Sequence, residues 1–194
     1  ASGLVNGPLG NTHCCIEDVG ALRSIPNLTI LSPADGVGIV KSVFAAAEHD
    51  KPTFIRLTGG ASNPIVYKDD VDFKIGKAIE IMSGEDLTVF ATGTMVNNSL
   101  QAANILAEKG ISASIFDMHT IKPIDEVAIA KAIAKNKPIV TVEEHSVIGG
   151  LGSAVSEYIS SGNKSPQQIS IGINDFFPKP GDYQYMLKQC GLMP

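Results

Sequence analysis

The sequence predicts an α/β fold in which an incomplete parallel-sheet unit is followed by a complete α/β domain. Apolar segments of strand length alternate with helical apolar patterns, first in the order strand, helix, strand within about 30 residues. A stretch rich in glycine, proline and aspartate interrupts the alternation before it resumes. The predicted division is a partial unit at 1–57, a linker at 58–76 and a self-contained domain at 77–194.

The first unit is predicted to contain two helices and two strands. Residues 16–26 repeat apolar side chains every three or four positions, with Glu17 and Asp18 at the positive end of the helix dipole. Asp35 is the expected N-cap of the longer helix. The other predicted elements are a strand at 28–31, a helix at 37–49 and a strand at 53–57. Residues 3–11 have the composition of a loop with no strand before it, which favours a domain that has lost its beginning or was never alone.

The second domain is predicted to have a sheet with helices on both faces, because crossover connections between parallel strands are right-handed. Strands are expected at 78–82, 87–91, 113–118, 139–143 and 168–173. Helices are expected at 96–107, 124–134, 152–160 and 183–189, the first of them ending at Gly110 in a left-handed C-terminal stop.

Composition excludes several classes of protein. The 194 residues are 44% hydrophobic and 18% charged, which is an ordinary globular balance. A net charge of −5 leaves no basic face for a phosphate backbone, so nucleic acid is not an expected partner. Three cysteines do not make a disulfide framework, which favours a reducing compartment, and no apolar stretch approaches the roughly 20 residues that span a bilayer. We therefore expect a cytoplasmic protein without a membrane partner.

Two loops could bind an anion. Gly10 to His13 precedes a predicted helix start, where free backbone N–H groups and the helix dipole favour negative charge, and His13 titrates near neutrality. Capping by Thr12 with a solvent-exposed His13 is the alternative. Gly149 to Ser153 opens another predicted helix but does not match a known phosphate-binding spacing, so close helix–strand packing is the favoured interpretation.

Charged residues on two predicted strands need partners. Successive strand residues point to opposite faces, so Glu143 and Glu144 are not expected to reach one ligand, and a hydrogen-bonded structural corner with His145 is favoured. Arg56 lies among apolar strand residues and must be paired or lie at a sheet edge. It could bind an anion or pair with a neighbouring acid, and the sequence does not separate these alternatives. Nucleophilic chemistry at Cys14 or Cys15 is not favoured, because no paired base is visible beyond His13.

Several runs together resemble the transketolase family. The resemblance covers nearly the whole chain and implies a partial pyrimidine-binding domain at 1–57 and a transketolase C-terminal domain at 77–194. It is closest to the C-terminal subunit of two-subunit transketolases and to deoxyxylulose-phosphate synthases. The matching runs are 11–18, 21–35 and 52–57 in the first unit, and 90–93, 120–123, 140–145 and 149–152 in the second.

The resemblance implies a function and a set of roles. His13 falls on the family's active-site histidine, which helps to hold the donor substrate and can assist proton movement, and it is the catalytic candidate. Asn11, Thr12 and Arg56 are the candidate substrate-binding residues. The implied reaction is transfer of a two-carbon ketol unit between sugars or sugar phosphates with thiamine diphosphate and Mg²⁺, which bind mainly to residues outside this chain. The implied assembly is a homodimer or a heterotetramer with a diphosphate-binding subunit.

Two departures from the family pattern affect the substrate. Leu9 stands where the family has an acceptor-facing aspartate, and Gly59 stands where it commonly has a phosphate-binding arginine. Each lost contact to a charged group removes about 1.5–3 kcal/mol of binding free energy.

The alternatives to a transketolase-like function are a deoxyxylulose-phosphate synthase-like enzyme, an α-keto-acid dehydrogenase β-type subunit, or a non-catalytic α/β partner or regulatory module.

Overall fold

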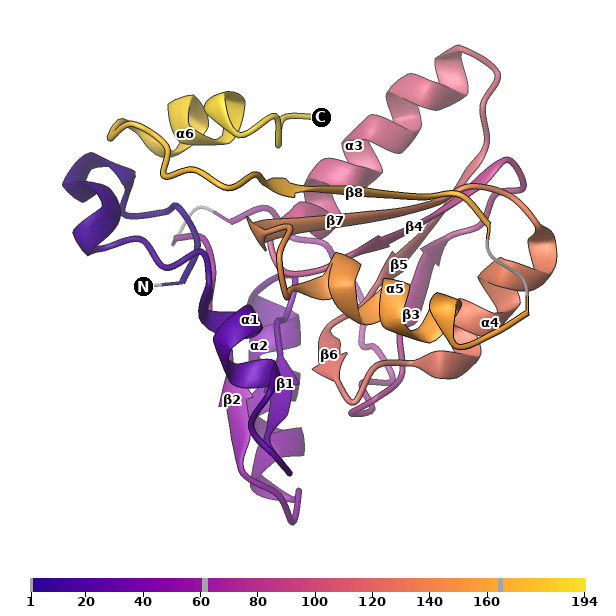
Figure 1. Cartoon of the computed structure of the whole chain (residues 1–194), viewed down its shortest axis with the longest axis horizontal. Helices are drawn as coiled ribbons and strands as arrows, with labels where there is room; N and C mark the ends of the chain where they lie inside the picture. Colours follow the sequence, from indigo (N-terminus) through magenta and orange to yellow (C-terminus); the bar gives the residue numbers. More distant parts are fainter. Residues whose placement is uncertain (1, 61–62, 164–165) are drawn as a thin grey trace.

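Two sheets form the framework of the protein (Figure 1). The computed structural model describes residues 2–60, 63–163 and 166–194. The larger sheet has the order β3 (Ile79–Met82), β5 (Ala113–Asp117), β4 (Leu87–Ala91), β7 (Ile139–Ser146) and β8 (Gln168–Ile173). The smaller sheet has the order β2 (Thr53–Ile55), β1 (Thr29–Leu31) and β6 (Thr120–Lys122).

The strand directions largely follow the prediction. β1 and β2 are parallel, as expected for strands joined by one crossover helix. In the larger sheet β5, β4, β7 and β8 are parallel, and the edge strand β3 runs antiparallel to β5. The sequence did not predict β6, which comes from the second domain and pairs antiparallel with β1. The smaller sheet therefore contains strands from both predicted units.

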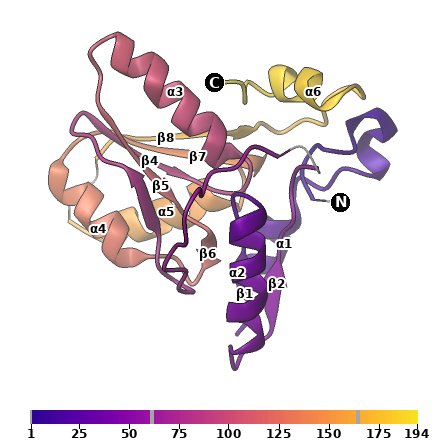
Figure 2. The ribbon, with the colours of Figure 1, turned by 180° about the vertical axis from the view of Figure 1, so that it is seen from behind.

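Helices cover both faces of the larger sheet, which confirms the prediction. Alternating side chains of β4 separate the two layers of the core. Val89 and Ala91 pack in the cluster with α3 (Met95–Glu108), whereas Phe90 packs in the cluster with α4 (Glu126–Lys135) and α5 (Leu151–Ser160). Figure 2 shows α3 and the pair α4 and α5 on opposite sides of the strands.

Most helices begin and end close to the predicted residues. Asp35 caps α2 (Gly36–Ala47), since its side chain accepts a hydrogen bond from Gly38 N at 2.9 Å. Gly110 has a φ of +78° at the end of α3, as predicted. The C-terminal helix α6 (Tyr183–Gln189) has the predicted bounds. No helix in residues 2–60, 63–163 and 166–194 is long and apolar enough to cross a membrane.

Four elements differ from the prediction. β2 ends at Ile55, two residues before its predicted end, so Arg56 lies just after the strand and not on it. α1 (Asp18–Arg23) is shorter than 16–26, because the backbone N–H of Ile16 binds the Glu17 carboxylate at 2.7 Å before the helix begins. A 3₁₀ helix, η1 (Gly7–Thr12), lies in the segment predicted as loop. β7 continues to Ser146, three residues beyond its predicted end, because the larger sheet keeps it paired with β8.

The segment predicted as a linker is hydrogen-bonded to both of the units that it connects. Its described residues form no helix or strand, yet Asp35 accepts hydrogen bonds from Val66 N at 2.8 Å and Tyr67 N at 2.9 Å. The Tyr67 hydroxyl then donates to Asp117 on β5 at 2.6 Å. Burial raises the pKa of Asp117 to about 7, although the Tyr67 bond acts in the opposite direction. The segment therefore joins α2 to the larger sheet.

His119 lies in the core beside β6. Its ring is fully buried, stacks on Phe73 with centroids 3.9 Å apart and has Nδ1 3.0 Å from the Thr120 hydroxyl. Burial lowers the pKa of His119 to about 4. Its neutral form is therefore the one that the folded state accommodates.

We expect His119→Gln to reduce the acid sensitivity of the fold. The folded-state pKa lies below the unfolded value, so this contribution to stability is present above about pH 6.5 and is lost as pH falls through about 4. The loss amounts to about 3 kcal/mol. Thermal unfolding of wild type, His119→Gln and the control His49→Gln between pH 7 and 4 measures it. Parallel pH profiles for all three proteins would contradict the expectation.

Candidate functional site

The candidate catalytic histidine lies on an exposed loop at the end of η1. Asn11, Thr12 and His13 are all exposed, and Thr12 Oγ1 lies 2.9 Å from His13 Nδ1. This contact fixes the orientation of the imidazole relative to the loop. The three residues that the sequence singled out in this loop are therefore adjacent and accessible to a ligand.

The start of α1 does not provide the anion site that the sequence suggested for this loop. α1 begins at Asp18 rather than at Ile16, and Glu17 and Asp18 carry their carboxylates into the region where an anion would bind. The protein's own negative charges therefore occupy the positive end of this short helix. Of the two interpretations of this loop, the structure agrees with a solvent-exposed His13.

Arg56 is a buried residue whose hydrogen bonds join the two units. Its side chain is 2% exposed, and Nε lies 3.0 Å from each carboxylate oxygen of Asp18. Its Nη2 donates to the backbone oxygens of Cys15 at 3.3 Å and Glu144 at 3.1 Å. Of the two alternatives left open by the sequence, the structure contains the pairing with a neighbouring acid. The sequence indicated that Arg56 needs a partner, but no sequence signal identified Asp18.

Glu143, Glu144 and His145 form the hydrogen-bonded corner that the sequence favoured. All three are 1% exposed, and the two carboxylates serve different elements because they point to opposite faces of β7. His145 Nε2 accepts from Gly20 N at 3.2 Å, and its Nδ1 lies 2.7 Å from Ser146 O. Burial, with a further contribution from Arg56, lowers the pKa of His145. The ring is thus held neutral as a structural link to α1.

Glu143 occupies the anion position at the start of α5. Its carboxylate accepts from Leu151 N at 2.7 Å and Gly152 N at 2.8 Å. Burial raises the pKa of Glu143 to about 7, while the two backbone donors favour its charged form. The glycine-rich turn at Gly149 to Ser153 therefore binds a carboxylate of the protein itself, which agrees with the favoured interpretation of close helix–strand packing.

Gly150 is required by this close approach, and we expect Gly150→Ala to destabilise the fold. A Cβ at this position would lie 1.9 Å from Glu143 Oε2 and 2.8 Å from His145 Nδ1. Overpacking of this kind costs about 1–3 kcal/mol. Chemical denaturation measures the loss, with Gly36→Ala as the control, because nothing lies within 4 Å of a Cβ there. Equal stabilities of the two variants would contradict the expectation.

The two positions that depart from the family pattern have distinct structural settings. Leu9 is 60% exposed in η1, so an apolar side chain faces solvent next to the loop of Asn11, Thr12 and His13, here called the histidine loop. Gly59 has a φ of +75°, and a Cβ there would lie 1.9 Å from Asn63 Oδ1. A side chain as large as arginine therefore does not fit the backbone at this position.

The cysteines and acidic residues add no reactive centre to the described part of the chain. Cys14, Cys15 and Cys190 are unpaired, and burial raises the pKa of the Cys14 thiol and, to about 11, that of the Cys190 thiol. These two thiols stay protonated and unreactive. Within the described ranges, no group of three histidine, cysteine or acidic side chains could hold a metal ion.

Two protein-family models match the chain. The model of the transketolase C-terminal domain matches residues 76–194, and that of the transketolase pyrimidine-binding domain matches residues 2–63. The chain belongs to the transketolase family. The larger sheet lies within the residues matched by the C-terminal domain, whereas the smaller sheet combines β1 and β2 from the pyrimidine-binding match with β6 from the C-terminal match. Members of the transketolase family are thiamine-diphosphate-dependent transferases.

Known transketolase proteins match almost the full chain. It is 40% identical over 193 residues to a putative transketolase C-terminal section of Methanocaldococcus jannaschii, covering 98% of this chain and 60% of the relative. It is 42% identical to one of the subunits of the apulose-4-phosphate transketolase from Phocaeicola vulgatus, covering 99% and 61%. A solved split-gene transketolase, an inactive β4 tetramer, superposes with a TM-score of 0.86 at 37% identity, covering 94% and 58%. The chain thus spans about three fifths of the length of these proteins.

Proposed function

We propose that the protein transfers a two-carbon ketol unit between sugars, as one part of a thiamine-diphosphate-dependent transketolase. The observation that carries this proposal is the exposed loop in the pyrimidine-binding domain, where Thr12 orients His13. Thiamine diphosphate supplies the carbanion stabilisation of such a transfer, and the protein orients the substrates. His13 hydrogen-bonds the substrate and moves a proton at a substrate oxygen, since an imidazole can both donate and accept a proton.

The other candidate residues take two different roles in this proposal. Asn11 and Thr12 contact the substrate from the exposed loop. Arg56 contributes to substrate binding from behind it, since its guanidinium holds Asp18 and the Cys15 backbone. The segment that follows His13 is thereby fixed to the core.

We propose that the active unit is an assembly in which another chain or domain binds the diphosphate and Mg²⁺. The two relatives described above are named as a section and a subunit of transketolases, which supports a partner that completes the enzyme. The arrangement is either a homodimer or a heterotetramer with a diphosphate-binding subunit. Val40, Val43 and Phe44 on α2 are more than half exposed, which is typical of a surface used in association. The three unpaired cysteines fit a cytoplasmic setting.

Reconstitution with the diphosphate-binding subunit tests the proposal. The complex, supplied with thiamine diphosphate and Mg²⁺, is expected to transfer a ketol unit from a ketose to an aldose acceptor, and either component alone is expected to be inactive. Phosphorylated and unphosphorylated acceptors are compared, because Leu9 and Gly59 lack the polar groups that the family directs at a sugar phosphate. A hydrogen bond to a charged group typically raises kcat/KM by about tenfold or more. We expect the phosphate group of the acceptor to raise kcat/KM by less than this.

The same assay separates the alternatives. A deoxyxylulose-phosphate synthase-like enzyme or an α-keto-acid dehydrogenase β-type subunit would consume a 2-oxo acid with release of CO₂, which ketol transfer does not do. A non-catalytic module would bind its partner without either reaction. CO₂ release without ketol transfer, or complex formation with no turnover, would overturn the proposal.

A further inference from the structure

Glu144, on β7 of the second domain, holds the start of the segment that leads to the loop of Asn11, Thr12 and His13. Its Oε1 accepts a hydrogen bond from Leu4 N at 2.5 Å, and both residues are buried. The neighbouring Gly3 N donates to Cys15 O at 2.7 Å, and a Cβ on Gly3 would lie 2.3 Å from the same Glu144 oxygen. The start of the segment that leads to η1 is therefore fastened to a side chain of β7.

The second oxygen of the same carboxylate binds the C-terminal helix. Glu144 Oε2 accepts from the Tyr183 hydroxyl at 2.6 Å and from the Thr94 hydroxyl at the start of α3. Burial and the Glu144 charge raise the pKa of Tyr183, so its hydroxyl stays protonated and donates. One buried carboxylate thus joins the loop entry, α3 and α6, three elements that are remote in sequence.

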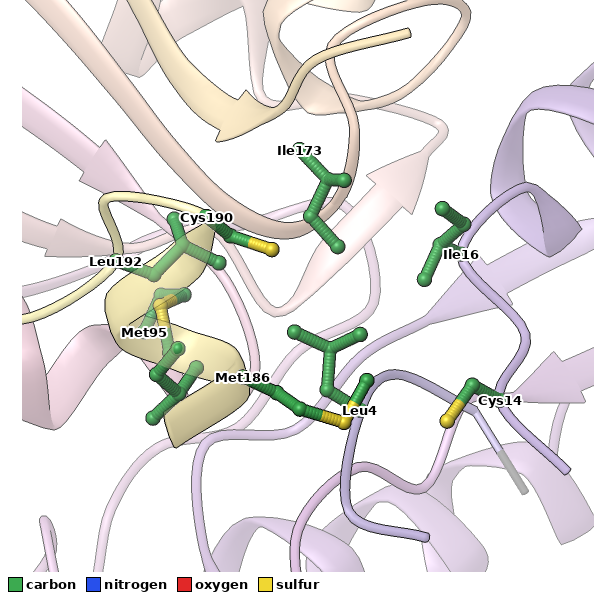
Figure 3. Close-up of a cluster of buried hydrophobic side chains, with 9 residues drawn as sticks. Leu4, Cys14, Ile16, Met95, Ile173, Met186, Cys190 and Leu192 are labelled. Carbon is green, nitrogen blue, oxygen red and sulfur yellow. The ribbon is translucent and has the colours of Figure 1, made fainter. Parts of the chain in front are cut away.

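Residues around α6 also determine the path of η1. Gly181 N donates to Gly7 O at 3.2 Å, and Met186 lies so close to Gly7 that a Cβ there would be 2.0 Å from its sulfur. Met186 and Leu4 belong to one buried cluster, in which Figure 3 shows the two side chains beside each other. Figures 1 and 2 both show α6 next to the N-terminal loop. The 3₁₀ helix that ends at the exposed His13 thus has α6 as its packing partner.

We propose that Tyr183 is a positioning residue: through Glu144 it sets the conformation of the loop that carries Asn11, Thr12 and His13. This inference rests on the proposed function for its effect on catalysis. The Tyr183 hydroxyl hydrogen-bonds the Glu144 carboxylate. It acts on the loop because the carboxylate that it binds also receives Leu4 N, and a carboxylate that loses a buried donor holds its remaining partners less firmly. The C-terminal domain then contributes directly to the geometry of a site located in the pyrimidine-binding domain.

Tyr183→Phe tests the proposal, because it removes one hydroxyl and keeps the ring. The matched control is Tyr185→Phe on the same helix, where the side chain is 45% exposed. In the reconstituted complex we expect amide hydrogen exchange of residues 3–13 to rise by about tenfold in Tyr183→Phe, as for the loss of a hydrogen bond to a charged group. Exchange in β4 is expected to stay at the wild-type rate. In steady-state kinetics we expect kcat for ketol transfer to fall by about tenfold, with a smaller change in KM.

Each result has a defined meaning. Wild-type exchange in 3–13, or an equal increase in β4, would overturn the proposal, because the loop would then be independent of Tyr183 or the whole domain would be loosened. Faster loop exchange with wild-type kcat would also overturn it, since the loop would not need this support for catalysis. If the wild-type complex has no ketol transfer, the proposed function fails, and the exchange measurement still decides whether Tyr183 sets the loop conformation.

Discussion

Replacing His13 with alanine is expected to lower kcat/KM for ketol transfer by at least about a hundredfold in the reconstituted complex. General acid–base catalysis by a positioned side chain contributes about 10²–10⁴-fold, and an imidazole also holds its substrate by hydrogen bonding. His13 is exposed at the end of η1, so its removal leaves no cavity in the core. The loss should therefore appear in the kinetics and not in the stability. Initial-rate assays at saturating thiamine diphosphate measure it.

His49→Ala is the matched control for this prediction. His49 lies just after α2 and binds the Thr29 hydroxyl at 2.9 Å, in a different part of the first unit. Its replacement should leave kcat/KM near the wild-type value. If His13→Ala retained wild-type ketol transfer, His13 would have no part in the mechanism. A lowered melting temperature for His13→Ala would instead show that its role is structural.

Replacing Arg56 with methionine is expected to cost about 3–5 kcal/mol in the free energy of unfolding. The change leaves Asp18, whose side chain is 9% exposed, without its cation, and removes the donors to the Cys15 and Glu144 backbone oxygens. A buried charge that loses its partner is far more costly than a lost surface pair. Denaturant unfolding monitored by circular dichroism measures the difference.

Two further variants separate charge burial from packing. Asp18→Asn combined with Arg56→Met should recover part of the loss, because no unpaired charge remains. Lys41→Met breaks the solvent-screened ion pair with Asp70 and should leave the free energy of unfolding close to the wild-type value. If Arg56→Met cost as little as Lys41→Met, Arg56 would not brace the two units.

The periodicity of the sequence predicted most of the secondary structure because local signals define those elements. Asp35 could be predicted as a cap and Gly110 as a helix stop, since each acts on backbone groups a few residues away. Helices on both faces of the larger sheet follow from right-handed crossovers together with the reversal of strand order after β5. β6 was missed because three residues carry too little periodicity, and their pairing with β1 depends on the tertiary structure.

The candidate site was predictable only as a set of residues. A motif resemblance identified the histidine loop, and strand geometry showed that Glu143 and Glu144 face different elements. No local pattern could indicate which donors each carboxylate receives, since the partners of Glu144 come from residues 4, 94 and 183. The group bound by the glycine-rich turn could not be predicted for the same reason, because it is the Glu143 side chain on the preceding strand.

The pairing of β6 with β1 has a consequence for biosynthesis. β1 and β2 leave the ribosome well before residues 120–122, so one hydrogen-bonding edge of β1 stays open during translation until the second domain is being made. A nascent chain arrested between the two domains would expose that edge, and chaperones or other nascent strands could pair with it. The first unit therefore matures only after the second has begun to fold, although it is synthesised first.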